Sequence, residues 1–295
     1  MKLLVPPAIC ALCLSRADLC ESHIIPAFFG AFLKETSATG FLRGAEAPNL
    51  RRQDLMKERL LCVCCEGRFA IWEKEFKEKA LATVQSDNFT NLRYGPWLMH
   101  FVVSLSWRVL VAQRELMIGK YPQFTDDVNA TLENWRLFLL EQRRRPNSEH
   151  HLFVFAGVPE SLPAEWHKKS LHYLLRAIDA TTAGSGRTLF VYTKALRSLI
   201  FSPIVPASPA GWINTRVHPG HGRLVSPQKI AMRGFADFLN SRVVEGFAQP
   251  LSVRQQSKID EAILNNPRRA LSSESYKVHK ATKRLRADVV PDEGN

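Results

Sequence analysis

The stretch Cys62-Val-Cys-Cys65-Glu-Gly-Arg-Phe69 carries a Cys-x-x-Cys pair into the start of a segment with helical spacing. An earlier stretch, Cys10-Ala-Leu-Cys13, has the same spacing, and all six cysteines of the chain lie before residue 66. Two sulfurs at this spacing can bind one tetrahedral Zn²⁺, and two such pairs complete a closed four-cysteine site. The sequence therefore predicts a structural zinc ion held by Cys10, Cys13, Cys62 and Cys65.

The residues after the second pair predict how this site is folded. Phe69, Trp72 and Phe76 fall at i, i+3 and i+7, which is one face of a helix. The amide groups at the N-terminus of such a helix favour negatively charged sulfurs. A turn with two cysteines, followed far along the chain by a helix start with two more, is a treble-clef arrangement. The alternatives are a redox pair and unrelated free thiols. We interpret the two remaining cysteines, Cys20 and Cys64, as small buried or half-buried thiols.

The composition is that of a globular protein with a strong positive charge. The chain has 295 residues, of which 45% are apolar, and this excludes a disordered chain, a collagen and a small disulfide scaffold. Lys and Arg number 40 against 28 Asp and Glu, so the formal net charge is +12. A balance of this sign favours an anionic partner.

The chain shows no sequence signal for a membrane. The most apolar segment, residues 97–112, contains His100 and Arg108, so it falls short of the roughly 18 uninterrupted apolar residues that a span requires. The start of the chain holds one lysine and the pair Pro6-Pro7, which is poor for a signal peptide. We therefore expect a cytoplasmic protein, where reducing conditions favour thiolate metal ligands over disulfides.

The hydrophobic pattern predicts an α+β fold in three regions. Residues 1–88 form the treble-clef zinc module, residues 89–250 a larger domain that is helical and then mixed α/β, and residues 251–295 a basic, partly helical and partly disordered tail. Within these regions we expect a loop over 36–50, helices over 97–112, 128–139, 171–178 and 231–239, strands over 152–155 and 188–192, and a hairpin turn at 218–221 between segments 213–217 and 222–225.

A histidine followed by a proline lies between the two cysteine pairs, in Glu21-Ser-His23-Ile-Ile-Pro26. With the pairs on either side, this segment resembles the zinc-stapled ββα-metal finger of HNH endonucleases, and the chain looks like a group of uncharacterised bacterial HNH-like proteins. The resemblance covers about residues 8–76.

The resemblance implies a metal-dependent phosphodiester hydrolase. His23 would be the general base that takes a proton from water, beside a catalytic Mg²⁺ or Mn²⁺. Glu21 and Glu66 are the carboxylates that could bind this metal. The alternative is a zinc-binding module that binds nucleic acid or protein without cleaving it.

The positive charge lies outside the zinc module. Residues 1–90 hold 12 Lys and Arg against 11 acids, whereas residues 91–295 hold 28 against 17. Such residues could contact the phosphates of nucleic acid, with DNA expected more than RNA, or they could simply form a solvated helix end and a soluble tail. The candidates for phosphate contact are Arg143, Arg144, Arg145, Arg268, Arg269, Lys283 and Arg284.

Overall fold

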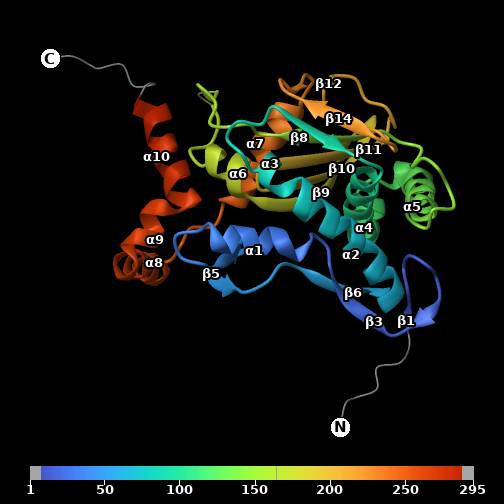
Figure 1. Ribbon diagram of the computed structural model, residues 1–295, viewed down its shortest axis with the longest axis horizontal. Coiled ribbons are helices and arrows are strands. Elements are labelled where there is room, and N and C mark those ends of the chain that lie inside the picture. Colours follow the sequence, from blue (N-terminus) through green and yellow to red (C-terminus); the bar gives the residue numbers. More distant parts are fainter. Residues whose placement is uncertain (1–7, 164, 288–295) are drawn as a thin grey trace, which may run out of the picture.

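The computed structural model describes residues 8–163 and 165–287 and shows the expected α+β fold (Figure 1). Its centre is a five-stranded antiparallel sheet in the order β13-β8-β11-β10-β9. The strands are β13 (Arg216–Val217), β8 (His150–Val154), β11 (Ser198–Val205), β10 (Thr188–Ala195) and β9 (Ile178–Ser185).

Helices cover both faces of this sheet. On one face lies α4 (Trp97–Lys120), which is flanked by α5 (Thr125–Leu139) and contacts β8, β9, β10 and β11. On the other lie α6 (Ser170–Arg176) and α7 (Phe235–Gly246). Successive residues of β10 serve the two cores in turn, because Val191 packs with the α4 core and Tyr192 with the α6 and α7 core. The predicted helices at 97–112 and 128–139 are confirmed.

The N-terminal region has the order of a treble clef. A turn joins β1 (Ala8–Ile9) to β2 (Arg16–Ala17), and β3 (Leu19–His23) then pairs with β6 (Lys57–Cys62). The helix α2 (Val63–Lys79) follows β6 directly. Between β3 and β6 the chain inserts α1 (Ala27–Glu35) and a hairpin of β4 (Leu42–Gly44) and β5 (Ala47–Arg52). The predicted loop over 36–50 was therefore wrong in part, because β4 has only three residues and β5 is mostly exposed, so neither shows an alternation of apolar and polar residues.

Two further details of the predicted secondary structure are wrong. The segments on either side of 218–221 do not pair as a hairpin, because β13 pairs with β8 whereas β14 (Gly222–Val225) pairs with β7 (Asn91–Tyr94). The helix predicted to reach Ile178 ends at Arg176, and Ile178 starts β9. The remaining short elements are α3 (Leu81–Val84), the 3₁₀ turn η1 (Pro122–Phe124), β12 (Trp212–Ile213) and β15 (Lys229–Ile230).

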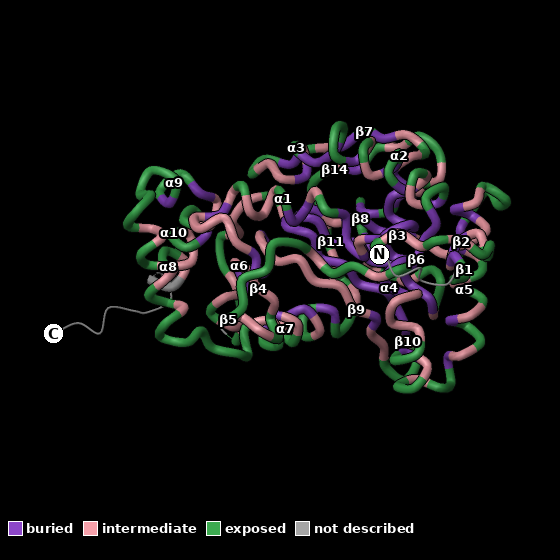
Figure 2. Tube along the Cα trace, turned by 90° about the horizontal axis from the view of Figure 1, so that it is seen from below, coloured by how far each residue is buried: buried purple, intermediate pink, exposed green. Residues whose placement is uncertain are grey.

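The C-terminal region is helical as far as it is described. It forms α8 (Val253–Asn265), α9 (Pro267–Ser272) and α10 (Glu274–Ala287), and residues 288–295 of the predicted tail lie outside the described residues. Val278 of α10 is buried against Leu171 and Leu175 of α6. In Figures 1 and 2 these helices lie at one end of the molecule and α5 lies at the other.

One hydrophobic core joins the zinc module to the sheet. The cluster that contains Cys10 and Leu12 also contains Leu105 of α4 and Val217 of β13, so it crosses the predicted boundary at residue 88. Division of the chain into independent domains stays a prediction. Among the described residues, no helix has both the length and the apolar character that crossing a membrane requires.

A charge at Val278 should detach α10. Val278 is 3% exposed, so Val278→Asp buries an unpaired carboxylate and should weaken the docking of α10 by about 2–3 kcal/mol. Limited proteolysis should then cut residues 273–287 much faster while the rest of the chain stays intact. Val253→Asp is the control, because Val253 of α8 is 84% exposed. Equal protease sensitivity of the two variants would contradict the docking of α10 on α6.

Candidate functional site

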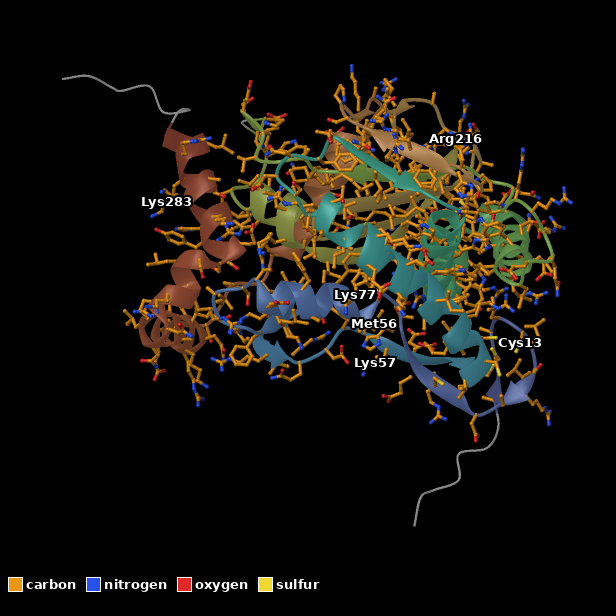
Figure 3. All side chains as sticks on the ribbon, viewed as in Figure 1. Cys13, Met56, Lys57, Lys77, Arg216 and Lys283 are labelled. Atoms are coloured by element: carbon orange, nitrogen blue, oxygen red, sulfur yellow. The ribbon has the colours of Figure 1, made fainter. Side chains whose placement is uncertain are left out.

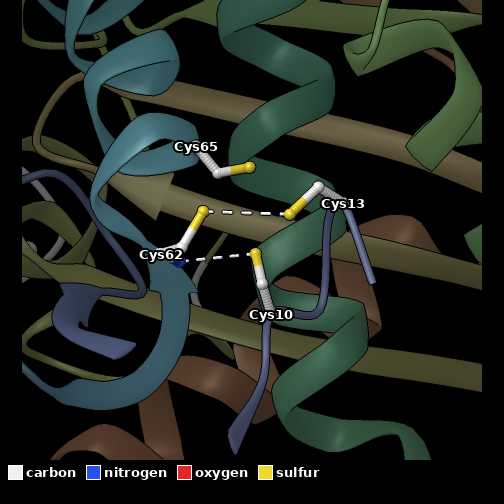
Figure 4. Close-up of side chains that lie close together, drawn as sticks. All are labelled: Cys10, Cys13, Cys62 and Cys65. Carbon is white, nitrogen blue, oxygen red and sulfur yellow. Dashed lines mark hydrogen bonds between the residues drawn. The ribbon is translucent and has the colours of Figure 1, made fainter. Parts of the chain in front are cut away.

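The four predicted cysteines come together at one point (Figure 4). Their sulfurs all lie within 4.8 Å of one another, and the Sγ atoms of Cys13 and Cys62 are 3.8 Å apart. Tetrahedral zinc with Zn–S bonds of about 2.3 Å separates its sulfur ligands by about 3.8 Å. The donor set and its spacing therefore fit a zinc ion.

The local backbone explains why these sulfurs converge. Cys10 and Cys13 lie in the turn between β1 and β2, which closes through a hydrogen bond from the Leu14 amide to the Cys10 carbonyl at 2.9 Å. Cys62 ends β6 and caps α2, and Cys65 lies in the first turn of that helix. The Cys62 amide also donates to Cys10 Sγ at 3.3 Å. A backbone donor of this kind stabilises a thiolate.

Burial disfavours negative charge on two of the four sulfurs unless a cation is bound. Burial raises the pKa of the Cys10 and Cys65 thiols, whereas a hydrogen bond from the Ser15 backbone lowers the pKa of Cys13 to about 6. Thiolates in such surroundings need a compensating positive charge, which a divalent metal supplies. Four protein ligands leave no open position on the metal, so the site is suited to structural zinc and not to catalysis. Cys64 is exposed and stands outside the cluster.

His23 lies at the opposite end of the β3–β6 strand pair from the cysteines. Its Nε2 is 2.9 Å from Oδ1 of Asp54, and Oδ2 of the same carboxylate is 2.6 Å from Nζ of Lys57. Figure 3 shows the separation, with Lys57 at one end of β6 and Cys13 near the other. The hydrogen bond from Lys57, together with that from His23, holds the pKa of Asp54 below its usual value. The ionised carboxylate can therefore orient the imidazole and leave Nδ1 to accept a proton.

Asp54 is the residue that the sequence analysis missed. It lies 31 residues from His23 in a connection before β6, and no spacing rule links the two positions. The available signal was its uniqueness, since it is the single aspartate between His23 and Cys62.

The predicted carboxylates do not gather around His23. Ser22 is fully buried and its hydroxyl donates to Oε2 of Glu66 at 2.7 Å. Adjacent residues of a strand point to opposite faces, so Ser22 and not His23 faces α2 and Glu66. Glu21 is exposed and lies opposite Arg59 in the strand register. In the described ranges, the four cysteines are the only group of three or more Cys, His, Asp or Glu side chains placed to share a metal ion.

The residues at His23 do not offer a ready site for Mg²⁺ or Mn²⁺. Both carboxylate oxygens of Asp54 already have a partner, and Glu66 shares one of its oxygens with Ser22. A hard cation prefers several converging oxygen ligands. The side chains around His23 therefore fit such a cation poorly in the arrangement they have.

A buried arginine fixes the backbone at His23. Arg108 of α4 is 1% exposed, and its Nη1 donates to the His23 carbonyl at 2.8 Å and to Oε1 of Glu73 at 2.8 Å. Its guanidinium also lies over the ring of Phe69, 5.2 Å from the centroid. Arg108 therefore ties β3 to both α2 and α4.

The predicted phosphate contacts do not form one surface. Arg143, Arg144 and Arg145 are exposed after α5, whereas the other candidates lie on the C-terminal helices at the opposite end of the molecule (Figure 1). Arg269 has a structural contact, because it donates to the carbonyl oxygens of Lys34, in the last turn of α1, and of Ser37, just after that helix. Arg268, Lys283 and Arg284 are exposed on α9 and α10.

Comparison of the chain with protein-family models, with curated proteins and with solved structures finds no match. The resemblance to HNH endonucleases therefore rests on the motif in residues 8–76 alone and stays a prediction.

Loss of one buried thiol should release the metal. Cys65→Ser removes a ligand from the cluster, so purified protein should lose its bound zinc, which metal analysis would show, and residues 8–80 should become sensitive to protease. Cys64→Ser is the matched control, because Cys64 is exposed one residue away. Zinc content that is unchanged in Cys65→Ser, or lost equally in Cys64→Ser, would contradict the four-cysteine site.

Removal of the buried arginine should be costly. Arg108→Ala leaves the Glu73 carboxylate and the His23 carbonyl without their cationic partner, and it should lower the free energy of unfolding by about 3 kcal/mol. Arg68→Ala, which breaks the exposed pair with Glu141 from the same helix α2, should cost less than about 1 kcal/mol. Urea denaturation measures both values. If both variants lose less than about 1 kcal/mol of unfolding free energy, Arg108 does not stabilise the packing of β3 and α2 on α4.

Proposed function

We propose that this chain is a zinc-stapled protein that hydrolyses phosphodiester bonds in nucleic acid, with His23 as general base and Asp54 as the residue that orients it. The observation that carries the proposal is the 2.9 Å contact between Asp54 Oδ1 and His23 Nε2. The pair is partly exposed, with 21% of the His23 side chain and 45% of the Asp54 side chain open to solvent. A substrate can therefore reach it.

His23 and Asp54 together can supply general-base catalysis of hydrolysis. Asp54 accepts the hydrogen bond from Nε2–H, which leaves the lone pair of Nδ1 free to take a proton from water. The water oxygen forms a bond to phosphorus as the bond from phosphorus to the leaving oxygen breaks. The leaving oxygen then takes a proton from solvent, and His23 returns its own proton to solvent.

The metals in this proposal have separate roles. Zinc on Cys10, Cys13, Cys62 and Cys65 holds the fold around β6 and α2. A catalytic Mg²⁺ or Mn²⁺ remains part of the proposal, but it would have to displace Lys57 from Asp54 to bind there. Assays with and without these ions therefore form part of the test.

Nucleic acid is the proposed substrate because of the charge of the chain. The net charge of +12 and the exposed cations Arg143, Lys283 and Arg284 favour a polyanion, with DNA expected before RNA. A cytoplasmic location belongs to the same proposal, since reducing conditions keep the thiols able to bind zinc.

A second candidate function is a non-catalytic module that binds nucleic acid or protein. The contact between Ser22 and Glu66 favours it, because the face of β3 that meets α2 carries a serine and not a histidine. In this case zinc would only fold the N-terminal region.

Cleavage assays on single-site variants distinguish the two functions. Wild-type protein should cleave plasmid DNA, single-stranded DNA or RNA, His23→Ala should abolish cleavage, and Asp54→Asn should slow it at least about 100-fold, because the neutral amide no longer stabilises the protonated imidazole. His221→Ala is the control, since His221 is exposed in the segment before β14. Zinc content must be equal in all four proteins.

Equal cleavage by wild-type protein and His23→Ala would reject His23 as the base. The absence of cleavage by every zinc-loaded, folded protein, with and without Mg²⁺ or Mn²⁺, would favour the binding module.

A further inference from the structure

A groove of about 670 Å³ runs beside the His23–Asp54 pair. The residues that follow His23, Ile24 and Ile25, line one end of it together with Asp54 itself. Its lining also includes residues of β9, residues at the end of α7, and Val109, Ala112 and Gln113 of α4. Asp54 therefore belongs both to the proposed catalytic pair and to the wall of the groove.

The walls of the groove are mainly aliphatic. Leu33, Leu42, Leu55 and Met56 contribute to them in addition to the isoleucines that follow His23. Met56 is 54% exposed, and Figure 3 shows it next to Lys57 at the start of β6. The volume lies in the range of 300–1,000 Å³ that is common for small-molecule sites.

The acidic side chains of the groove are all paired with cations, whereas two of its arginines have no acidic hydrogen-bond partner. Each of its four carboxylates already has a cationic partner, because Asp54 pairs with Lys57, Glu46 with Arg52, and both Asp179 and Glu245 with Arg242.

Two arginines remain in the groove. Arg43 donates to the Pro48 carbonyl at 2.9 Å and to the Gln255 side chain at 3.2 Å, and Arg176 donates only to Thr36 and to the Leu33 carbonyl. Their hydrogen-bond partners are all uncharged, although the Glu274 carboxylate is near enough to Arg176 to interact with its charge. Nη2 of Arg43 is buried and has no hydrogen-bond partner among the described residues. These guanidinium groups, and Arg43 above all, can therefore attract an anionic group of a ligand.

We propose that this groove binds the nucleotide next to the scissile phosphodiester, with its base against the aliphatic walls and its phosphate toward Arg43 and Arg176. The proposal rests on the proposed function, since it names the substrate class of the same site. A ligand that combines an apolar planar body with a single anionic group matches this lining, whereas a free phosphate would leave the aliphatic walls unused. Apolar side chains make no hydrogen bonds that distinguish one nucleobase from another, so little sequence preference is expected.

The binding test uses His23→Ala, which keeps the groove but removes the proposed base. Calorimetry of the full-length protein should show that a dinucleoside monophosphate binds more tightly than a nucleoside 5′-monophosphate, and that a nucleoside or inorganic phosphate alone binds much more weakly. Adding Ala112→Phe places a ring inside the groove, where it should compete with the nucleotide and weaken dinucleotide binding about tenfold. Inorganic phosphate that binds as tightly as the mononucleotide would overturn the proposal.

Ala70→Phe is the matched control, because Ala70 is exposed on α2 and does not line the groove. Its affinity for the dinucleotide should equal that of His23→Ala alone. If Ala112→Phe does not fold, protection of residues 42–56 from hydrogen exchange by the dinucleotide replaces it, and no protection there would overturn the proposal.

Failure of the groove can be told apart from failure of the proposed function. Wild-type protein that cleaves, with dinucleotide affinity unchanged by Ala112→Phe, would reject the groove and keep the hydrolase. Protein that never cleaves but loses dinucleotide binding in Ala112→Phe would keep the groove as a nucleotide site and reject the hydrolase.

Discussion

Arg108 brings a positive charge into the middle of a helix that is buried on nearly every side, and two neighbouring elements supply partners for its Nη1, whereas its Nη2 has no hydrogen-bond partner among the described residues. A charge in such a place is tolerated only with close partners. The partners come from two different elements, the carboxylate of Glu73 on α2 and the carbonyl of His23 at the end of β3. This requirement fixes α2, which carries Cys65, and β3, which carries His23, relative to α4, and α4 packs on the central sheet.

The cysteine cluster and Arg108 constrain the N-terminal region at two points along α2. The cysteines act at its first turn, and Glu73 lies nearly three turns later. The strands β1 and β2 have two residues each, so they bury little apolar surface of their own. A metal at the four cysteines would add order to this region, which also shares the hydrophobic core that contains Leu105 and Val217. Arg108 acts at His23 itself, because it donates to the His23 carbonyl.

The sequence was most informative where function and structure depend on local spacing. The two Cys-x-x-Cys pairs predicted the four-cysteine cluster, and the apolar run of 97–112 predicted α4, because both signals lie within a few residues of one another. Asp54 was missed because its meaning comes from a strand pairing that brings residues 31 positions apart together. The strands β9 and β11 were missed for other reasons. The edge strand β9 has the sequence Ile-Asp-Ala-Thr-Thr-Ala-Gly-Ser, which holds too few large apolar residues to predict a strand. In β11, Pro203 argues against a central strand.

The β4–β5 hairpin, which forms part of the groove wall, is held by residues that come more than 200 positions later. Asn49 accepts a hydrogen bond from the Ser252 amide at 2.7 Å, and Arg43 donates to Gln255 of α8 at 3.2 Å. An isolated two-stranded hairpin is marginally stable in water, so these two hydrogen bonds to the C-terminal region stabilise this one. Those helices thus act as a brace for a wall of the groove as well as a source of positive charge. A ligand that orders the hairpin will therefore also stabilise the docking of α8. A change that detaches α8 will in turn make the hairpin less ordered and lower the affinity of the groove.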